Sequence, residues 1–244
     1  MKLGIFGRGR LGSAVATAAA AELAWQVARE EPPAGTVDCV VEASAGAATP
    51  GRIDWALEHR TPIVVASTGW ELADLEERIG ERIGLLLAPN LSLTVALCVR
   101  LTTVLARFAA LDPARDPYIQ EHHHARKRDA PGGTARLLAR TILEACPRKT
   151  TYLQPPADRA LEPHELCVSA VRGGHTASSH TIAVDAPGEV LSLSHQSRDL
   201  SPYGAGALAA SRWLVGRRGV FTMSDFADSV LEPLFSPIDR QVQS

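Results

Sequence analysis

The chain has 244 residues, with 25 lysine or arginine and 27 aspartate or glutamate residues, and its formal net charge is -2. Its length suits one large domain or two modest ones, and 45% apolar with 21% charged residues is typical of a folded globular protein. The balanced charge gives no reason to expect nucleic acid or an anionic membrane as the main partner.

Strand and helix patterns alternate through the first part of the chain. Short apolar runs predict strands at 2–7, 23–28, 38–44, 61–67 and 84–89. Amphipathic runs between them predict helices at 11–23, 49–59 and 70–81. The second strand is ambiguous, because 21–30 also reads as a continued helix. Repeated strand–helix–strand units favour a parallel sheet that is covered on both faces.

The pattern changes after a long apolar helix that we expect at 90–111. Polar and apolar residues alternate in the segments that follow, which predicts strands at 116–124, 166–174, 179–186 and 189–197. Pro187, Gly188 and Glu189 mark a hairpin turn between the last two strands. These segments predict a second domain with a mostly antiparallel sheet, and 204–231 reads as helical again.

The first turn of the chain carries a glycine motif. The stretch "GIFGRGRLGSA" fits G-x-G-x-x-G between a strand and a helix. The first glycine allows a tight turn, the second lets the backbone approach a pyrophosphate, and the third lets the helix pack close to the strand. The alternative is a glycine-rich turn that only packs. We predict dinucleotide contacts from Gly7, Gly9, Arg10, Leu11 and Gly12.

The remaining cofactor contacts are expected where later strands end. Glu30 in "VAREEPP" is the candidate acceptor of the adenine-ribose hydroxyls, whereas Arg29 beside it suits a 2′-phosphate, so NADH and NADPH both stay open. Trp70 is expected to pack. The other predicted contacts lie in "ASTGW" and "APNLSL": Ser67, Thr68, Gly69, Pro89, Asn90 and Leu91.

A cationic, histidine-rich loop, "EHHHARKRDAPGGTA", precedes a helical pattern at 135–146. The backbone N–H groups of Gly133 and Thr134 should face an open helix terminus, which is a carboxylate site, and Thr134 is a candidate cap. Lys127 adds a positive charge. Because histidine titrates near neutrality, it is the usual proton donor when a hydride is added to a C=C–C=N system. The loop therefore suits reduction of a dicarboxylate.

Other interpretations of the histidines remain. His122 and His124 are alternate strand residues on one face and could bind zinc, but we predict no metal because further ligands are missing. The basic residues could also be a solvated strand end. His195 and Arg198 either reach the active site or form a structural cross-strand pair.

Several motifs, in order along the whole chain, resemble the 4-hydroxy-tetrahydrodipicolinate reductase (dihydrodipicolinate reductase) family. They are "GRGRLG", "VVEAS", "ASTGW", "APNLSL", "EHHHARKRDAPGGTA", "VRGG", His180 and "HQSRDLSPYGAGALAASRWL". The resemblance implies a Rossmann domain at 1–91 with 199–244, and a substrate domain at 92–198 that assembles a homotetramer. It implies reduction of 4-hydroxy-tetrahydrodipicolinate in diaminopimelate and lysine biosynthesis, with NADH or NADPH as cofactor.

The resemblance also implies roles in the histidine-rich loop. His123 and Lys127 match the family's proton-donating pair, and His124, Lys127, Gly133 and Thr134 match its contacts with the substrate carboxylates. The chain departs from the family pattern at Gly132, where serine is usual, and in its shortened second strand. The alternatives are therefore a paralogue that reduces another cyclic imine dicarboxylate and a non-catalytic dinucleotide-binding protein.

Cysteine usage and hydropathy bear on the compartment. The four cysteines are far apart, without a CxxC pair, so we expect buried free thiols in a reducing compartment: Cys39, Cys98, Cys146 and Cys167. No uncharged stretch reaches the ~20 residues that span a bilayer. We expect a cytoplasmic protein whose partners are a small dicarboxylate and further copies of itself.

Overall fold

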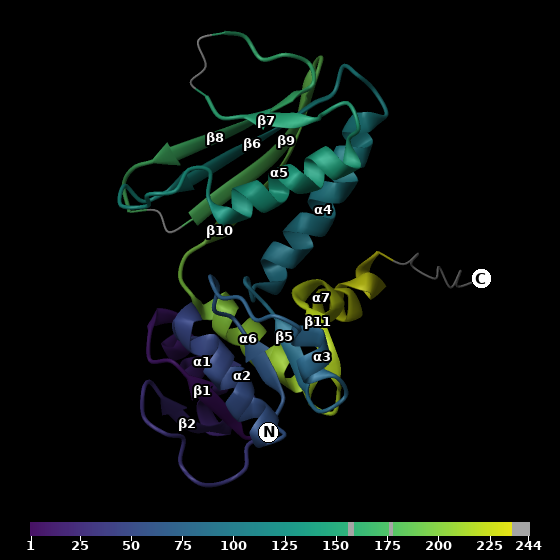
Figure 1. Ribbon diagram of the computed structural model, residues 1–244. Helices are drawn as coiled ribbons and strands as arrows, with labels where there is room; N and C mark the ends of the chain where they lie inside the picture. The colour runs from purple at the N-terminus through teal and green to yellow at the C-terminus, as the bar shows by residue number, and fades with distance from the viewer. Residues whose placement is uncertain (156–158, 176–177, 236–244) are drawn as a thin grey trace, which may run out of the picture. The chain divides into compact units, whose positions relative to one another are not determined.

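The computed structural model describes residues 1–155, 159–175 and 178–235. The chain divides into two compact units, Met1–Leu93 with Leu200–Ser244 and Thr94–Asp199. Figure 1 shows the purple start and the yellow end of the chain in the same unit. The unit boundaries therefore fall at 93/94 and 199/200, whereas the sequence predicted 91/92 and 198/199.

The first unit contains a parallel six-stranded sheet in the order β11-β5-β4-β3-β1-β2. Its strands read as nearly continuous apolar runs because both faces of the sheet are covered. Their bounds are β1 Leu3–Phe6, β2 Leu23–Val27, β3 Cys39–Glu42, β4 Ile63–Val65, β5 Gly84–Leu87 and β11 Gly219–Thr222. The strand order reverses beside β1, which is where open α/β sheets bind their ligands.

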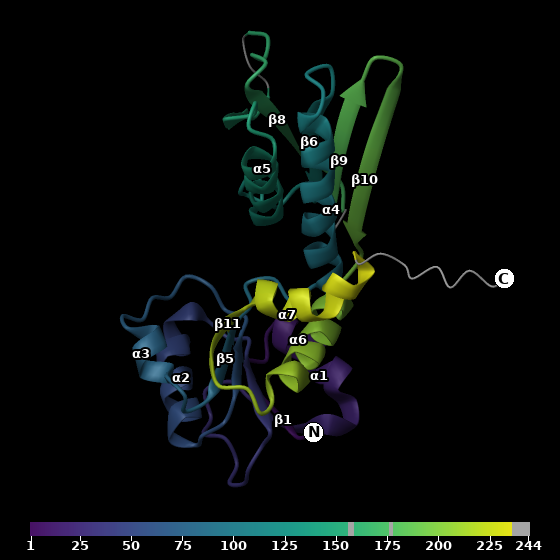
Figure 2. The ribbon, with the colours of Figure 1, turned by 90° about the vertical axis from the view of Figure 1, so that its right-hand side faces the viewer.

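Helices cover both faces of this sheet (Figures 1 and 2). One face packs on α1 (Arg10–Ala19), α6 (Ser201–Leu214) and α7 (Met223–Leu231), with Val15, Ala207 and Phe226 fully or almost fully buried. The opposite face packs on α2 (Thr49–Glu58) and α3 (Leu75–Ile79) through Ile53 and Ile79. The predicted α/β class with a parallel first sheet is confirmed.

The last part of the chain was predicted as wholly helical, and this is wrong at 219–222. Those residues form β11, which pairs parallel with β5 and extends the sheet. "GVFT" is too short to show a strand period, and its pairing partner lies more than a hundred residues earlier. The helix predicted at 70–81 is also shorter, since only 75–79 is helical. The ambiguous second strand is a strand.

The second unit contains a five-stranded sheet in the order β10-β9-β6-β8-β7. The bounds are β6 Asp116–His123, β7 Thr151–Leu153, β8 Glu165–Arg172, β9 Ser178–Ala186 and β10 Glu189–Ser197. The sheet is mixed, because β9 pairs antiparallel with β6 and β10 while β8 pairs parallel with β6 and β7. The expectation of a mostly antiparallel sheet missed the crossover through α5 (Gly133–Ala145), which makes β6 and β7 parallel.

Two helices, α4 (Leu93–Ala110) and α5, cover one face of the second sheet (Figure 1). Cys98 and Ala106 of α4 and Leu138 of α5 join Ile119 and Ile182 in a buried cluster. By length and composition α4 could cross a membrane, with a mean hydropathy of 1.6, but core helices of soluble proteins meet the same test. All four cysteines are free, and only Cys167 is not fully buried.

Candidate active site

The glycine turn after β1 has the backbone geometry that its motif predicts. Gly7 has a φ of +116°, and a Cβ there would lie 2.5 Å from the carbonyl oxygen of Ala43. A Cβ at Gly12 would lie 2.2 Å from the carbonyl oxygen of Gly7, whereas a Cβ at Gly9 would meet nothing within 4 Å. Two of the glycines are therefore required by packing, and the third leaves open space beside the backbone.

The open space lies at the N-terminus of α1. Gly9 is the N-cap, its residue type gives no side-chain cap, and the first turn carries no acidic residue. Such a terminus presents N–H groups and a positive dipole end, which suit a pyrophosphate. The exposed Arg10 and the partly buried Leu11 follow in this turn. These residues fit a dinucleotide.

The turns after β3, β4 and β5 lie at the same edge of the sheet, because these parallel strands end in register. Ser67 shares a 2.5 Å hydrogen bond with Thr49, and Trp70 donates its indole N–H to the Ser67 carbonyl at 3.0 Å. Trp70 also packs on the core, as expected. Thr68 and Gly69 are exposed at this edge.

The predicted contacts after β5 differ in accessibility. Pro89 is exposed, and the Asn90 side chain accepts the N–H of Ser92 at 3.0 Å. Leu91 is only 1% exposed and belongs to the core, with its carbonyl oxygen against Gly206 of α6. Its side chain packs in the core, so the cofactor contact predicted at Leu91 would have to come from the backbone, and it stays a prediction.

Glu30 lies at the end of β2 beside the glycine turn. Its Oε1 is 2.8 Å from Nη1 of Arg8, and its Oε2 accepts the backbone N–H groups of Ala28 and Arg29 at 2.6 and 3.0 Å. Backbone N–H groups, those of Glu30 itself and Ala28 foremost, lower the pKa of Glu30 to about 2. The cation that pairs with this carboxylate is Arg8, whereas Arg29 contributes its backbone N–H.

The histidine-rich loop begins where β6 ends. Asp129 accepts from Lys127, with 2.7 Å between Nζ and Oδ1, and its Oδ2 lies 3.7 Å from Nη2 of Arg136. The hydrogen bond from Lys127 lowers the pKa of Asp129. Lys127 also lies over Gly132, where a Cβ would be 3.0 Å from the lysine Cε. The loop thus holds the lysine stem against the start of α5.

Helix α5 begins without a side-chain cap. Its N-cap is Gly132, and no acidic residue stands in its first turn. Thr134 is the second residue of the helix, so the expectation that it caps α5 is wrong. The first intrahelical bond runs from the Arg136 N–H to the Gly132 carbonyl at 3.0 Å, so Gly133 and Thr134 have no acceptor within the helix. A Cβ at Gly133 would meet nothing within 4 Å, which leaves room for a carboxylate.

The three histidines point to different environments. Nε2 of His122 lies 3.0 Å from the Gly173 carbonyl oxygen. His124 is partly buried, and its Nδ1 has no hydrogen-bond partner among the described residues. His123 shares its face of the sheet with Glu121, because alternate strand residues point the same way. His122 and His124 therefore differ in their hydrogen-bond surroundings.

Glu121, two residues before His123 on the same face of β6, is a buried carboxylate. Glu121 is 1% exposed, and its Oε2 lies 3.6 Å from Nε2 of both His123 and His180. Its Oε1 accepts the Gly132 N–H at 2.8 Å and Nη2 of Arg172 at 2.5 Å. Burial alone would raise the pKa of Glu121, but the neighbouring His180 and Arg172 outweigh it and hold the pKa at about 2.

Sequence reasoning gave no role to Glu121 or Arg172 and used His180 only as a family match. The register explains why they meet: Glu121 is opposite His180 on β9, and His123 is opposite Arg172 on β8. His195 on β10 is in turn opposite His180, and burial lowers its pKa. His195 is thus a cross-strand neighbour of His180. The sequence signal that could have revealed this cluster is Glu121, a charged residue at a strand position where the alternation predicts an apolar one.

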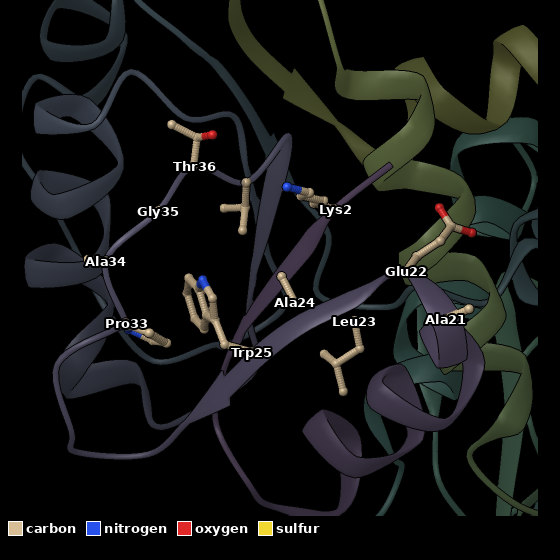
Figure 3. Close-up of a pocket in the computed structure, with 11 residues that line it drawn as sticks. Lys2, Ala21, Glu22, Leu23, Ala24, Trp25, Pro33, Ala34, Gly35 and Thr36 are labelled. Carbon is tan, nitrogen blue, oxygen red and sulfur yellow. The ribbon is translucent and has the colours of Figure 1, made fainter.

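The first unit has a hollow at the edge of its sheet opposite the glycine turn. It has a volume of about 360 Å³ and lies where β1 and β2 begin (Figure 3). Lys2, Glu22, Trp25 and Thr36 are among its lining residues. Since the glycine turn follows the opposite ends of these strands, this hollow is not the predicted cofactor site.

Comparisons with known proteins agree with this arrangement. Residues 94–227 match the family model described as dihydrodipicolinate reductase, C-terminus. A 4-hydroxy-tetrahydrodipicolinate reductase from Zymomonas mobilis is 32% identical over 92% of this chain and 96% of its own. Another, from Caldanaerobacter subterraneus, is 31% identical over 77% of this chain and 76% of its own. A dipicolinate-bound dihydrodipicolinate reductase from Paenisporosarcina has the same fold, with a TM-score of 0.73 and 18% identity over 91% of this chain and 97% of its own.

Proposed function

This chain belongs to the dihydrodipicolinate reductase family, and we propose that it reduces 4-hydroxy-tetrahydrodipicolinate to tetrahydrodipicolinate in diaminopimelate and lysine biosynthesis. The observation that carries the proposal is the 32% identical reductase, which aligns with 92% of this chain. An alignment of this length necessarily spans the histidine-rich loop in the middle of the chain. The reaction removes water and adds a hydride and a proton to the ring.

A bound nicotinamide dinucleotide supplies the hydride. The glycine turn is the part of this chain that would hold it, with Gly9 and Arg10 at the open terminus of α1. The fit rests on the empty space beside Gly9 and on the absence of an acidic residue from the first turn. Ser67, Thr68 and Gly69 would contact its nicotinamide half, since they follow β4, a parallel strand that ends at the same edge and is separated from β1 by β3.

The histidine-rich loop would bind the substrate and deliver the proton. The backbone N–H groups of Gly133 and Thr134 have no acceptor within the helix and would bind carboxylate oxygens, with His124 as a further contact. Lys127 contributes a positive charge and lies beside the same terminus. His123 and Lys127 would donate the proton, because both are only partly buried.

Both NADH and NADPH are proposed as cofactors, with a modest preference for NADH. Glu30 would accept ribose hydroxyls and repel a 2′-phosphate, and Arg8 at 2.8 Å softens that repulsion. A titration with each cofactor tests this. NADPH binding more than about tenfold tighter than NADH, worth about 1.4 kcal/mol, would contradict the assignment of Glu30.

We also propose a cytoplasmic homotetramer joined through the second sheet. Strand β10 is an edge strand, and Val190 and Leu191 on it are 56% and 51% exposed. An apolar edge of this kind needs a partner to avoid uncontrolled pairing. Light scattering tests the assembly: a tetramer supports it, and a monomer that persists at high concentration contradicts it.

The function is tested by a coupled assay. Pyruvate and aspartate semialdehyde are condensed in place to give the substrate, this protein and NADH or NADPH are added, and nicotinamide absorbance is followed. We expect cofactor oxidation that depends on the condensation product. Dinucleotide binding without oxidation would instead identify a non-catalytic binding protein.

One observation keeps a second candidate substrate in view. Gly132 replaces a serine that is usual in the family, and a Cβ there would lie 2.9 Å from Glu121 and 3.0 Å from Lys127. The side chains of Glu121 and Lys127 therefore lie in the space that a side chain at position 132 would need. Another cyclic imine dicarboxylate is favoured if, in the same assay, it is reduced faster than the condensation product.

A further inference from the structure

A row of ionisable side chains crosses the second sheet beneath the histidine-rich loop. Glu121 on β6 faces His180 on β9, and His180 faces His195 on β10. His123 stands two residues after Glu121 on the same face. Glu121 and His180 are 1% and 3% exposed, whereas His123 and His195 are partly buried, so the centre of the row is enclosed.

The two oxygens of Glu121 have separate surroundings. Oε1 is committed to the Gly132 N–H and to Arg172, whose Nη2 also donates to the Asp129 carbonyl at 2.6 Å. Oε2 is buried and makes no hydrogen bond within the described part of the chain, although two imidazole nitrogens lie 3.6 Å away. One oxygen therefore fixes the loop, and the other is aimed at the proton donor.

A buried carboxylate stabilises a positive charge placed next to it, because little water screens the pair. A proton on His123 creates such a charge 3.6 Å from Oε2. A small rotation of the ring would convert this contact into a charge-assisted hydrogen bond. The same carboxylate also holds the Gly132 N–H, so it ties the proton donor and the start of α5 to one point.

We propose that Glu121 is a positioning residue that keeps His123 protonated and oriented for proton delivery, with His180 closing the carboxylate off from solvent. This rests on the proposed function, in which His123 donates the proton. The rings of His123 and His180 are 5.5 Å apart at 77°, so His180 also limits how far the His123 ring can turn.

The other charged side chains described near His123 are already paired with one another. Arg172 from β8 already binds Oε1, and Asp129 in the loop is paired with Lys127 and Arg136 of α5. His195 on β10 is separated from His123 by His180 in the strand order. Among the described residues named here, Glu121 is the carboxylate with an oxygen 3.6 Å from the His123 imidazole.

The side chains of Glu121, His123 and His180 have ligand atoms within 4.8 Å of one another, a spacing that could hold a metal ion. Two histidines and a glutamate would suit zinc. We favour the proton, because Arg172 shares the carboxylate and its positive charge would oppose a divalent ion. The experiment below separates the two.

The test compares the pH profiles of kcat and KM for the full-length wild-type protein, Glu121→Gln and the control His122→Gln. A proton donor must be protonated, so activity falls as pH rises through the basic limb of the profile. Removing the carboxylate should move that limb down by about one pH unit or more. The loss should be small at about pH 6 and about tenfold or larger at about pH 8, mainly in kcat. His122→Gln should leave the limb in place.

A purely structural role would give a different result. Glu121→Gln would then lower kcat by the same factor at every pH, and this outcome would overturn the proposal. If the Gln variant does not fold, Glu121→Asp takes its place, because it keeps the charge but withdraws it by one methylene. A smaller downward shift of the limb supports the proposal, and an unshifted limb with reduced turnover overturns it.

A second measurement does not depend on turnover. The titration of His123 is followed by NMR with labelled histidine, using His123→Ala for assignment, in the wild-type protein and in Glu121→Gln. A lower midpoint in the variant supports the proposal even if the substrate assignment fails, and equal midpoints overturn it. Zinc bound one per chain, whose removal by a chelator abolishes turnover, would also overturn it in favour of a metal.

Discussion

The loop before α1 and the loop before α5 both lead from a strand into a helix whose N-cap is a glycine without a side-chain cap. Around α1 the chain supplies little besides backbone and open space at Gly9. Around α5 it supplies Lys127, three histidines and a buried glutamate. By contrast, α7 is closed by a capping box of Thr222 and Asp225.

The difference shows what each task requires. Holding a pyrophosphate needs N–H groups and close approach, which glycines provide through backbone geometry. Delivering a proton needs a charged side chain kept in one state and one orientation, which takes buried partners from several strands. We therefore expect substitutions in the first loop to act mainly through steric clashes. Substitutions in the second loop should act mainly through loss of charge.

The largest expected effect is that of Lys127→Ala. Losing the charge should raise KM, because substrate and transition state share that contact. Losing a proton donor should lower kcat by a factor on the order of 10²–10⁴. Steady-state kinetics measure both constants. His122→Ala is the matched control, and if it loses as much activity as Lys127→Ala, the assignment of the loop is wrong.

A pair of glycine substitutions should separate packing from binding in the first loop. Gly12→Ala places a Cβ 2.2 Å from the Gly7 carbonyl oxygen, and such overpacking costs about 1–3 kcal/mol of unfolding free energy. Gly9→Ala meets nothing within 4 Å, so it should leave stability unchanged and weaken dinucleotide binding. Denaturant unfolding and cofactor titration check the two. If both variants lost the same unfolding free energy, the distinction between a packing glycine and a binding glycine would be wrong.

The second unit should be the more sensitive to acid. Glu121 and Glu165 are buried there with pKa values of about 2, against an ordinary value of 4.5. Their contribution to stability is complete above pH 4.5 and is lost as pH falls toward 2. Burial raises the pKa of Glu42 in the first unit. Protonation of Glu42 at low pH therefore removes an unfavourable buried charge there.

Hydrogen exchange on the intact chain measures this difference. As pH falls below 4.5, amides of β6 and β8 should lose protection before those of β1 and β3. Earlier opening of the first unit would contradict the sign of these shifts. Because Glu30 is exposed, its low pKa should contribute little to the comparison.

The sequence predicted the first loop better than the second for a physical reason. Gly7, Gly9 and Gly12 act through local backbone geometry, and their spacing is visible along the chain. Glu121, Arg172 and His180 meet only through the register of β6, β8 and β9. Strand β11 was missed in the same way, because four residues gain their strand character from pairing with β5.

The division of labour between the two loops is tested most directly by single-turnover kinetics of His123→Ala with bound dinucleotide. We predict a cofactor Kd within about twofold of wild type and a reduction rate lower by a factor on the order of 10²–10⁴. An unchanged rate, or a loss of cofactor affinity that accounts for the whole effect, would contradict the account.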